Sequence, residues 1–187
     1  MAASAMAIPN SIEFWDGMKD EYLSHNDIRD NPIEYPIISQ HVEGSVVEFG
    51  PAFGCFWKYL AYYNQQKYLG IEISKTLLAE AIQRNPSAKF IEGDLLNNNI
   101  ASRSFDTVVV LQLLEHFNRA DFAKALCEMI RIANLKIILS VPNREMIPDS
   151  SHMQIFTYES MFDILKVYGP VTFLPGQAHH IIAMIRF

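Results

Sequence analysis

The sequence is poor in cysteine and in basic residues. Its two cysteines, Cys55 and Cys127, lie far apart and share no Cys-x-x-Cys or Cys/His spacing, so they predict neither a disulfide framework nor a zinc site. Lysine and arginine number 15 against 21 aspartates and glutamates, which gives a net charge of −6. A large nucleic-acid interface needs clustered cations to displace counterions from phosphates, so this balance predicts no nucleic-acid partner and favours a small or neutral substrate.

Long apolar runs are missing as well. No run approaches the length of a membrane span, and the start MAASAMAIPN lacks the basic region and the continuous apolar segment of a signal peptide. We therefore expect a cytoplasmic protein that makes no membrane contact. The chain has 187 residues and half of them are hydrophobic, which is enough for one sizeable core and short for two. Its oligomeric state stays open.

Short apolar runs alternate with helical patterns from Val46 onward, which is typical of a parallel sheet built from strand-helix-strand units. Runs such as TVVVL and KIILSV are apolar at consecutive positions, as expected for strands covered by helices on both faces. The predicted strands are Val46 to Phe49, Tyr68 to Glu72, Lys89 to Glu92, Phe105 to Leu111 and Leu135 to Val141. The tail segments VTFLP and HHIIAMIRF predict two more strands, joined at Pro175-Gly176 as an antiparallel pair.

Capping residues mark the helices between these strands. Ser74 and Asn118 each precede an apolar stripe, and a third helix is predicted from Thr157 to before Gly169-Pro170. The side chains expected to face the core are Leu77, Leu78, Ala81 and Ile82 in the first helix, Phe122, Leu126, Met129 and Ile130 in the second, and Met161, Phe162 and Leu165 in the third.

The first 44 residues have a different pattern. The segment SIEFWDGMKDEYL predicts an amphipathic helix with Ile12, Trp15, Met18 and Tyr22 on one face, and the segment with Asn31-Pro32 and Tyr35-Pro36 predicts a linker. We expect residues 1–44 to form a lid helix and linker, and residues 45–187 to form the domain that contains the parallel sheet. Phe14, Trp15 and Tyr22 are candidates for an aromatic cover over a cation, with core packing as the alternative for Phe14.

The stretch VVEFGPAFGCFWKYL joins an apolar strand to a helix through a turn of small residues. In an open parallel sheet, ligands bind beyond the carboxyl ends of the strands, at the point where the strand order reverses. The small residues let the backbone approach a ligand, and the helix that follows offers free N–H groups. Glu48 beside this turn opposes a phosphate and favours an ammonium, so we expect a ligand with a positive amine.

This turn resembles motif I of the class I S-adenosylmethionine-dependent methyltransferases, with Ala52 where the middle glycine usually stands. GIEIS, FIEGD, FDTVVVLQLLEHF and KIILSVPN resemble later motifs of the small-molecule branch, in the right order and spacing. The resemblance implies a doubly wound α/β fold with a mostly parallel seven-stranded sheet of order 3-2-1-4-5-7-6, strand 7 antiparallel and helices on both faces. It also implies S-adenosyl-L-methionine as cofactor, S-adenosyl-L-homocysteine as product and a small-molecule methyl acceptor.

The resemblance assigns cofactor contacts position by position. Glu72 would accept hydrogen bonds from the ribose diol, although a solvated strand-end acid is the alternative. Ile73 would pack on the adenine, or belong to the core; Asp94 would accept from the adenine amine, or simply close a turn. The full set of expected cofactor residues is Glu48, Gly50, Ala52, Phe53, Gly54, Glu72, Ile73, Asp94, Leu95, Leu111 and Gln112.

Three of these positions carry particular expectations. Leu95 would offer its N–H to the adenine, and the main chain of Leu111 and Gln112 would meet the methionyl ammonium, with an ordinary exposed polar role as the alternative for Gln112. Ala52 would push the cofactor carboxylate outward if its φ is positive.

Two histidines are the expected catalytic residues. His116 follows the fourth strand at the ligand edge, and His152 lies in the loop after the fifth strand; each would take a proton from the acceptor where one must be lost. A packing role for His116 and a surface role for His152 remain open. No carboxylate pair has the context of a Mg²⁺ site, so no metal is expected. A catalytically silent cofactor-binding module is the main alternative function, and a nicotinamide-dependent oxidoreductase is disfavoured by Glu48 and the terminal antiparallel strands.

Overall fold

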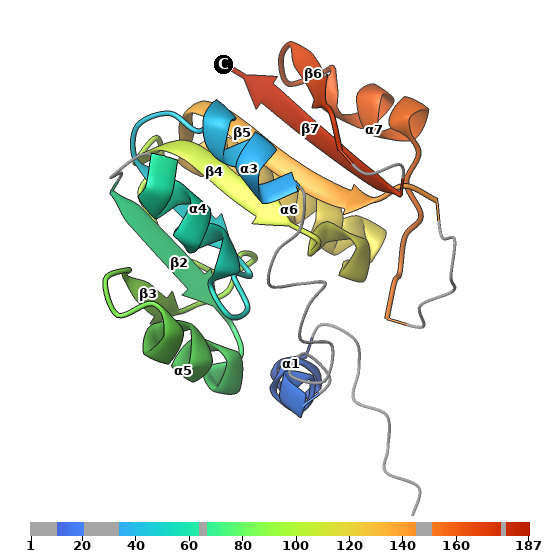
Figure 1. Cartoon of the computed structure of the whole chain (residues 1–187). Helices are drawn as coiled ribbons and strands as arrows, with labels where there is room; N and C mark the ends of the chain where they lie inside the picture. The colour runs from blue at the N-terminus through green and yellow to red at the C-terminus, as the bar shows by residue number, and fades with distance from the viewer. Residues whose placement is uncertain (1–10, 21–33, 64–66, 145–150, 177–178) are drawn as a thin grey trace, which may run out of the picture.

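The structure is a computed structural model that describes residues 11–20, 34–63, 67–144, 151–176 and 179–187. Its centre is one seven-stranded sheet of order β3-β2-β1-β4-β5-β7-β6 (Figure 1). The first five strands run parallel, and β7 is antiparallel to both β5 and β6. The predicted strand order and directions are confirmed. The strands are β1 (Val46–Phe49), β2 (Tyr68–Glu72), β3 (Phe90–Glu92), β4 (Phe105–Leu111), β5 (Ala133–Pro142), β6 (Val171–Leu174) and β7 (His180–Arg186).

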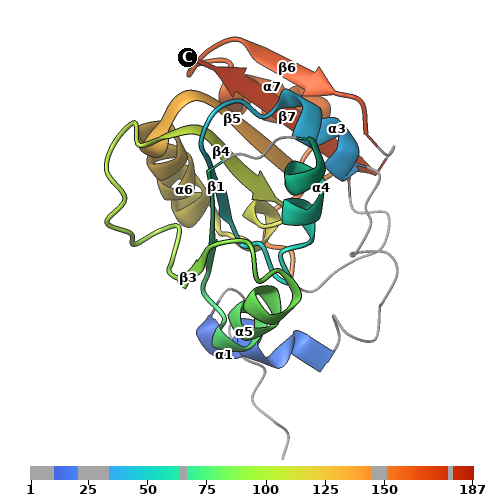
Figure 2. The same cartoon turned by 60° about the vertical axis from the view of Figure 1, so that its left-hand side comes forward.

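Helices cover both faces of the sheet, as Figure 2 shows from the side. One face carries α3 (Glu34–His41), α4 (Cys55–Tyr63) and α5 (Lys75–Arg84), and the other carries α6 (Arg119–Ile132) and α7 (Tyr158–Leu165). A short helix α1 (Ile12–Gly17) and a 3₁₀ turn η1 (Leu114–His116) complete the described elements. No helix among the described residues is long and apolar enough to cross a membrane.

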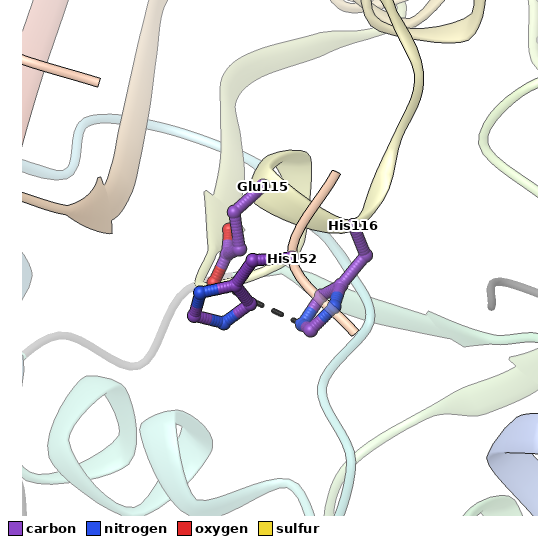
Figure 3. A group of neighbouring side chains, drawn as sticks. All are labelled: Glu115, His116 and His152. Atoms are coloured by element: carbon purple, nitrogen blue, oxygen red, sulfur yellow. Dashed lines mark ion pairs between the residues drawn. The ribbon is translucent and has the colours of Figure 1, made fainter. Parts of the chain in front are cut away.

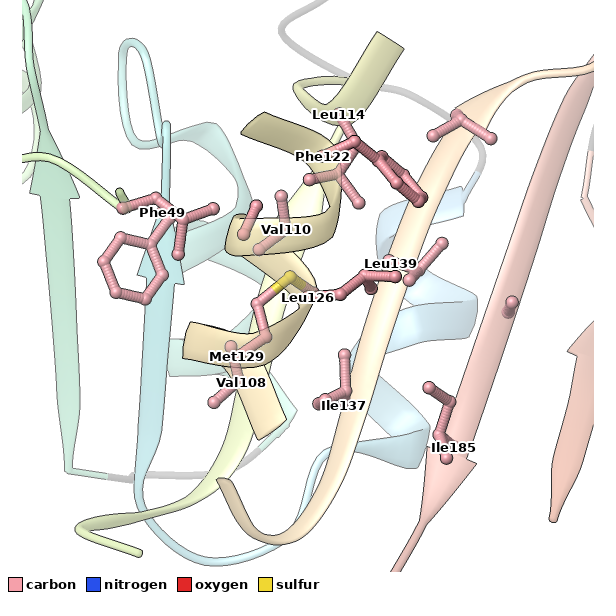
Figure 4. Close-up of a cluster of buried hydrophobic side chains, with 14 of the residues drawn as sticks. Phe49, Val108, Val110, Leu114, Phe122, Leu126, Met129, Ile137, Leu139 and Ile185 are labelled. Atoms are coloured by element: carbon pink, nitrogen blue, oxygen red, sulfur yellow. The ribbon is translucent and has the colours of Figure 1, made fainter. Parts of the chain in front are cut away.

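Strand alternation sends successive side chains to opposite faces. In β4, Val108 and Val110 face α6 and pack against Leu126 and Met129 of that helix (Figure 4), whereas Val109 lies in the cluster on the other face. Both sets are buried, which explains why β4 has no polar face in the sequence.

The predicted caps are present. The Ser74 hydroxyl accepts from the Leu77 N–H at 3.2 Å, and the Asn118 side chain accepts from the N–H groups of Ala120 and Asp121 at 2.9 Å. Thr157 caps α7 through a reciprocal pair with Ser160.

Two predicted core residues are exposed instead. Ile82 and Phe162 are 49% and 45% exposed, because each lies at the edge of its helix's apolar stripe, where the sheet no longer covers it.

The stretch before β1 differs from the predicted linker. Residues 34–41 form helix α3, and Pro36 is compatible with it because a proline in the first helical turn costs no intrahelical hydrogen bond. Ile38 is fully buried in the same apolar cluster as Phe56 and Leu60 of α4. The core therefore includes part of the segment before residue 45, while the lid role of the preceding helix stays a proposal. Tyr22, Asn31 and Pro32 lie outside the described residues.

Candidate functional site

A pocket lies at the carboxyl edge of β1, β2, β3 and β4, the point where the strand order reverses. It encloses about 540 Å³ of empty space, a volume that includes space open to solvent. Seven of the predicted cofactor residues line it: Gly50, Ala52, Glu72, Ile73, Asp94, Leu95 and Gln112. The strand ends that the sequence singled out therefore meet in one place.

The turn after β1 has left-handed backbone at three positions. Gly50 and Gly54 have φ of 70°, and Ala52 has φ of 48°, a region that alanine adopts only at a cost. The Ala52 N–H donates to the Glu72 carboxylate at 3.0 Å, which ties the turn to the end of β2. From the sequence we expect Ala52 to push the cofactor carboxylate outward if its φ is positive, and φ is indeed positive here.

The two glycines are needed for different close contacts. A Cβ on Gly50 would lie 3.1 Å from Leu113, on the wall of the pocket. A Cβ on Gly54 would lie 2.6 Å from the Phe90 ring and 2.8 Å from the Asn85 amide, behind the pocket. The missing side chain at Gly54 allows close packing against Phe90 of the sheet. The missing side chain at Gly50 allows Leu113 to approach closely at the pocket wall.

Glu72 is buried at the end of β2 and still lines the pocket. Its two carboxylate oxygens accept from the Ala52 and Ser74 N–H groups, each at 3.0 Å. Burial raises the Glu72 pKa from 4.5 to about 7, and the backbone donors partly offset this. A carboxylate oxygen has more than one acceptor site, so both oxygens retain capacity toward a ligand in the pocket.

Glu48 is equally buried but does not line the pocket. The register places it opposite Gly70, two residues before Glu72 along β2, and therefore deeper in the sheet. Its carboxylate accepts from the Tyr68 hydroxyl at 2.5 Å. Burial, followed by the nearby Glu72 charge, raises the Glu48 pKa to about 8, against the lowering effect of the Tyr68 bond.

The remaining predicted residues divide between the wall and the layer behind it. On the wall, Asp94 accepts from the Leu96 N–H at 2.8 Å, as a turn aspartate does. Gln112 has φ of 51° and donates through its side chain to the Ser140 hydroxyl at 3.1 Å. Phe53, Gly54 and Leu111 do not line the pocket; Phe53 and Leu111 are buried in apolar clusters.

Helix α1 lies at the same edge of the sheet, beside the start of α5 (Figure 1). Its Asp16 carboxylate accepts from the Ser74 hydroxyl at 2.6 Å, a bond that lowers the Asp16 pKa, and from the Thr76 N–H at 3.2 Å. Lys19 pairs with Glu80 at 2.8 Å. Trp15 is 5% exposed and lines the pocket, whereas Ile12, predicted for the same buried face, is 44% exposed.

The two candidate catalytic histidines lie side by side next to the pocket rather than in its wall. The His116 ring meets the edge of Trp15 at 4.9 Å between centroids, and His152 lies 5.1 Å from His116. Trp15 therefore connects the pocket wall to the imidazoles, because it lines the pocket and also contacts the His116 ring.

Residues 46–135 match the family model described as a methyltransferase domain. Together with the strand order of the sheet, this match gives the chain the fold of the class I S-adenosylmethionine-dependent methyltransferases. No curated protein sequence matches the chain.

Solved methyltransferase structures share the fold at low sequence identity. DhpI in complex with S-adenosylhomocysteine is 14% identical with a TM-score of 0.77, and the match covers 98% of each chain. A methyltransferase of Aquifex aeolicus is 12% identical with a TM-score of 0.70, over 89% of this chain and 97% of its own. Magnesium protoporphyrin IX methyltransferase of Synechocystis PCC 6803, with bound S-adenosylhomocysteine, is 16% identical with a TM-score of 0.61, over 94% and 82%.

The pocket also contains residues that were not predicted from the sequence. They are Phe49, Ile71, Leu77, Gly93, Leu113 and Phe117. Phe49, Ile71, Gly93 and Leu113 adjoin predicted residues, so widening each motif by one position would have found them. Leu77 and Phe117 are apolar residues whose sequence pattern does not differ from that of core residues.

Proposed function

We propose that the chain is an S-adenosylmethionine-dependent methyltransferase that acts on a small molecule and binds its cofactor in the strand-end pocket. The observation that carries the proposal is the position of Glu72 and Asp94, two carboxylates at successive strand ends on one pocket wall. Glu72 would accept from the ribose hydroxyls and Asp94 from the adenine amine, with Ile73 and Leu95 against the adenine. Two of the similar solved proteins are described with S-adenosylhomocysteine bound, which supports the same cofactor here.

The methionyl end would lie over the Gly50–Ala52 turn and the main chain of Gln112. Its ammonium would then meet backbone carbonyls and not the Glu48 carboxylate. That carboxylate accepts from the Tyr68 hydroxyl and lies deeper in the sheet, opposite Gly70. Phe53, Gly54 and Leu111 would support this turn from behind.

The acceptor would enter on the side of Trp15, His116 and His152. Methyl transfer needs the nucleophile, the methyl carbon and the sulfur in line, and α1 would help to hold that line by excluding water through Trp15. Where the acceptor must lose a proton, either imidazole is close enough to the Trp15 side of the pocket to assist. The porphyrin methyltransferase among the similar structures supports a small-molecule acceptor.

A screen of metabolite extract with methyl-labelled S-adenosylmethionine tests this function. The expected result is a labelled product with the wild-type chain and much less of it with Glu72→Ala when the labelled cofactor is kept at a limiting concentration. Cofactor binding without any labelled product in extracts of several sources would favour a catalytically silent module instead.

A further inference from the structure

Glu115, His116 and His152 form a compact group beside the pocket (Figure 3). Each offers one potential ligand atom, and these three atoms all lie within 4.8 Å of one another. Glu115 and His116 are buried in η1, and His152 is half-buried in the segment after β5. The chain thus brings two imidazoles and a carboxylate together from two separate segments.

The hydrogen bonding of His116 fixes which ring nitrogen carries its proton. Nδ1 lies 3.2 Å from the Ser151 carbonyl oxygen, and a carbonyl only accepts, so Nδ1 must donate. In the neutral ring Nε2 then keeps a lone pair, and it lies 3.9 Å from Oε1 of Glu115. Metal-binding histidines usually donate their second ring N–H to a carbonyl or carboxylate in this way.

The segment that carries His152 is attached to η1 by its backbone. The Met153 and Gln154 N–H groups donate to the Glu115 carbonyl at 2.8 and 3.2 Å. The Gln154 side chain donates to the Phe117 carbonyl at 2.8 Å. These bonds fix the backbone around His152 relative to Glu115 and His116, so the backbone itself brings the three side chains together.

We propose that Glu115, His116 and His152 bind a divalent transition-metal ion of the zinc type. Two imidazoles and one carboxylate suit such ions, whereas Mg²⁺ and Ca²⁺ prefer oxygen ligands alone. Bonds of about 2.1 Å place tetrahedral ligand atoms about 3.4 Å apart, so the His116–Glu115 distance of 3.9 Å closes with small side-chain rotations. No metal was predicted from the sequence, which contains no paired carboxylates in a Mg²⁺ context and separates His152 from the LLEHF motif.

Three protein ligands leave at least one coordination position open, as in catalytic zinc sites. Trp15, which meets His116, lines the pocket, as do Leu113 and Phe117 on either side of η1. Resting on the proposed function, the open position takes a hydroxyl oxygen of the acceptor. With the ion bound, His116 and His152 act as its ligands in place of the general-base role, because a metal-bound imidazole nitrogen has no lone pair left for a proton. The ion makes the hydroxyl more acidic, its proton passes to water, and the oxygen attacks the methyl carbon as the carbon–sulfur bond breaks, giving a methyl ether and S-adenosylhomocysteine.

Zinc binding by the whole chain tests the proposal without any methyl transfer. The chain, free of purification tags and stripped with a chelator, is titrated with Zn²⁺ against a chromophoric competitor and with Co²⁺ by visible absorption. We expect one ion to bind per chain in the wild type. His152→Ala should bind it at least about tenfold more weakly. His152 is only half-buried, so this variant should still fold. His179→Ala is the matched control, because His179 is an exposed histidine of the terminal strands, and it should bind like the wild type.

Several results would overturn the proposal. They are a folded wild-type chain that binds neither ion, undiminished binding in His152→Ala, or loss of binding in His179→Ala, which would put the ion on the terminal strands. Glu115→Gln, which keeps the side-chain shape, should weaken binding as well. A parallel titration with S-adenosylhomocysteine separates the two proposals, since metal binding without nucleoside binding contradicts only the proposed function, and the reverse contradicts only the metal site.

Discussion

The cofactor side and the acceptor side of the pocket are formed by different kinds of structural element. On the cofactor side, Glu72 is the last residue of β2, while Gly50, Ala52 and Asp94 follow the ends of β1 and β3. Backbone N–H groups hold the two carboxylates. On the acceptor side, aromatic and imidazole rings from three distant segments meet edge to face, with Trp15, His116 and His152 in sequence at 4.9 and 5.1 Å.

The backbone of the sheet therefore fixes the cofactor side of the pocket, whereas segments outside the sheet form the acceptor side. The cofactor side is positioned by the main-chain ladder of β1, β2 and β3, so it changes little unless the sheet does. The acceptor side depends on α1, which is held to the start of α5 through the Asp16 side chain, and on the segment after β5, which is held to η1 by backbone hydrogen bonds. Acceptor choice can therefore change while the cofactor side stays the same, and the two sides should respond differently to mutation.

Removing the N-terminal segment should have the largest effect. Deletion of residues 1–30 takes away Trp15 and the Asp16 anchor to Ser74, so water enters the acceptor side. We expect a folded, cooperatively unfolding chain that has lost methyl transfer while its cofactor affinity drops only modestly, as measured by a labelled-methyl assay and by calorimetry. Failure to fold would make the segment part of the core, and full activity would move the acceptor site elsewhere.

Glu72→Ala should have the next largest effect, and on the cofactor side alone. A charge-assisted contact of a carboxylate with a ribose diol is worth roughly 1.5–3 kcal/mol, so affinity for S-adenosylhomocysteine should fall by about tenfold or more. Because the Glu72 pKa is raised to about 7, wild-type affinity should also rise as pH increases through that value and the carboxylate forms. Unchanged affinity in a folded variant, measured by calorimetry, would remove Glu72 from the ribose site.

The sequence anticipated the cofactor side better than the acceptor side for a physical reason. Glu72 ends the strand YLGIE, and Asp94 lies two residues after the strand FIE. The ends of parallel strands share one edge of the sheet, so the sequence pattern alone predicts that these two carboxylates meet. In the sequence Glu48 resembles Glu72, since both are acids at the end of a predicted strand. Its position behind the pocket depends on the strand register and on the hydrogen bond from Tyr68, and no local sequence pattern reveals either. The meeting of Glu115 with His152 depends on the path of a segment after β5, which the sequence does not specify.

Asp94→Asn should weaken the cofactor side less than Glu72→Ala. An amide oxygen still accepts from the adenine amine, so only the charge-assisted part is lost, about 1 kcal/mol or about fivefold in affinity. Titration of S-adenosylhomocysteine into Asp94→Asn and Glu72→Ala side by side measures this order. Complete loss of binding in a folded Asp94→Asn would contradict a role as simple acceptor.

Glu48→Gln should leave cofactor affinity unchanged and alter stability instead. Burial raises the Glu48 pKa from 4.5 to about 8, so the folded state holds more protons than the unfolded state between these values, and the free energy of unfolding falls as pH rises. The variant has no carboxylate to ionise there, so above about pH 8 it should be more stable than wild type by at least about 1 kcal/mol.

Urea unfolding at several pH values measures this difference, which should shrink toward pH 5. Glu72 contributes a similar slope up to about pH 7 in both chains, so its contribution cancels when the two free energies of unfolding are subtracted. A Glu48→Gln chain that loses stability at every pH, or loses cofactor affinity, would show that the ionised carboxylate of Glu48 has a role of its own.

The most direct test of the central claim is a calorimetric titration of the wild-type chain with S-adenosylhomocysteine and, separately, with NAD. The strand-end pocket predicts one S-adenosylhomocysteine bound per chain and no heat of binding from NAD. A folded chain that ignores S-adenosylhomocysteine, or that binds NAD instead, would contradict the claim that this pocket holds the methyl donor.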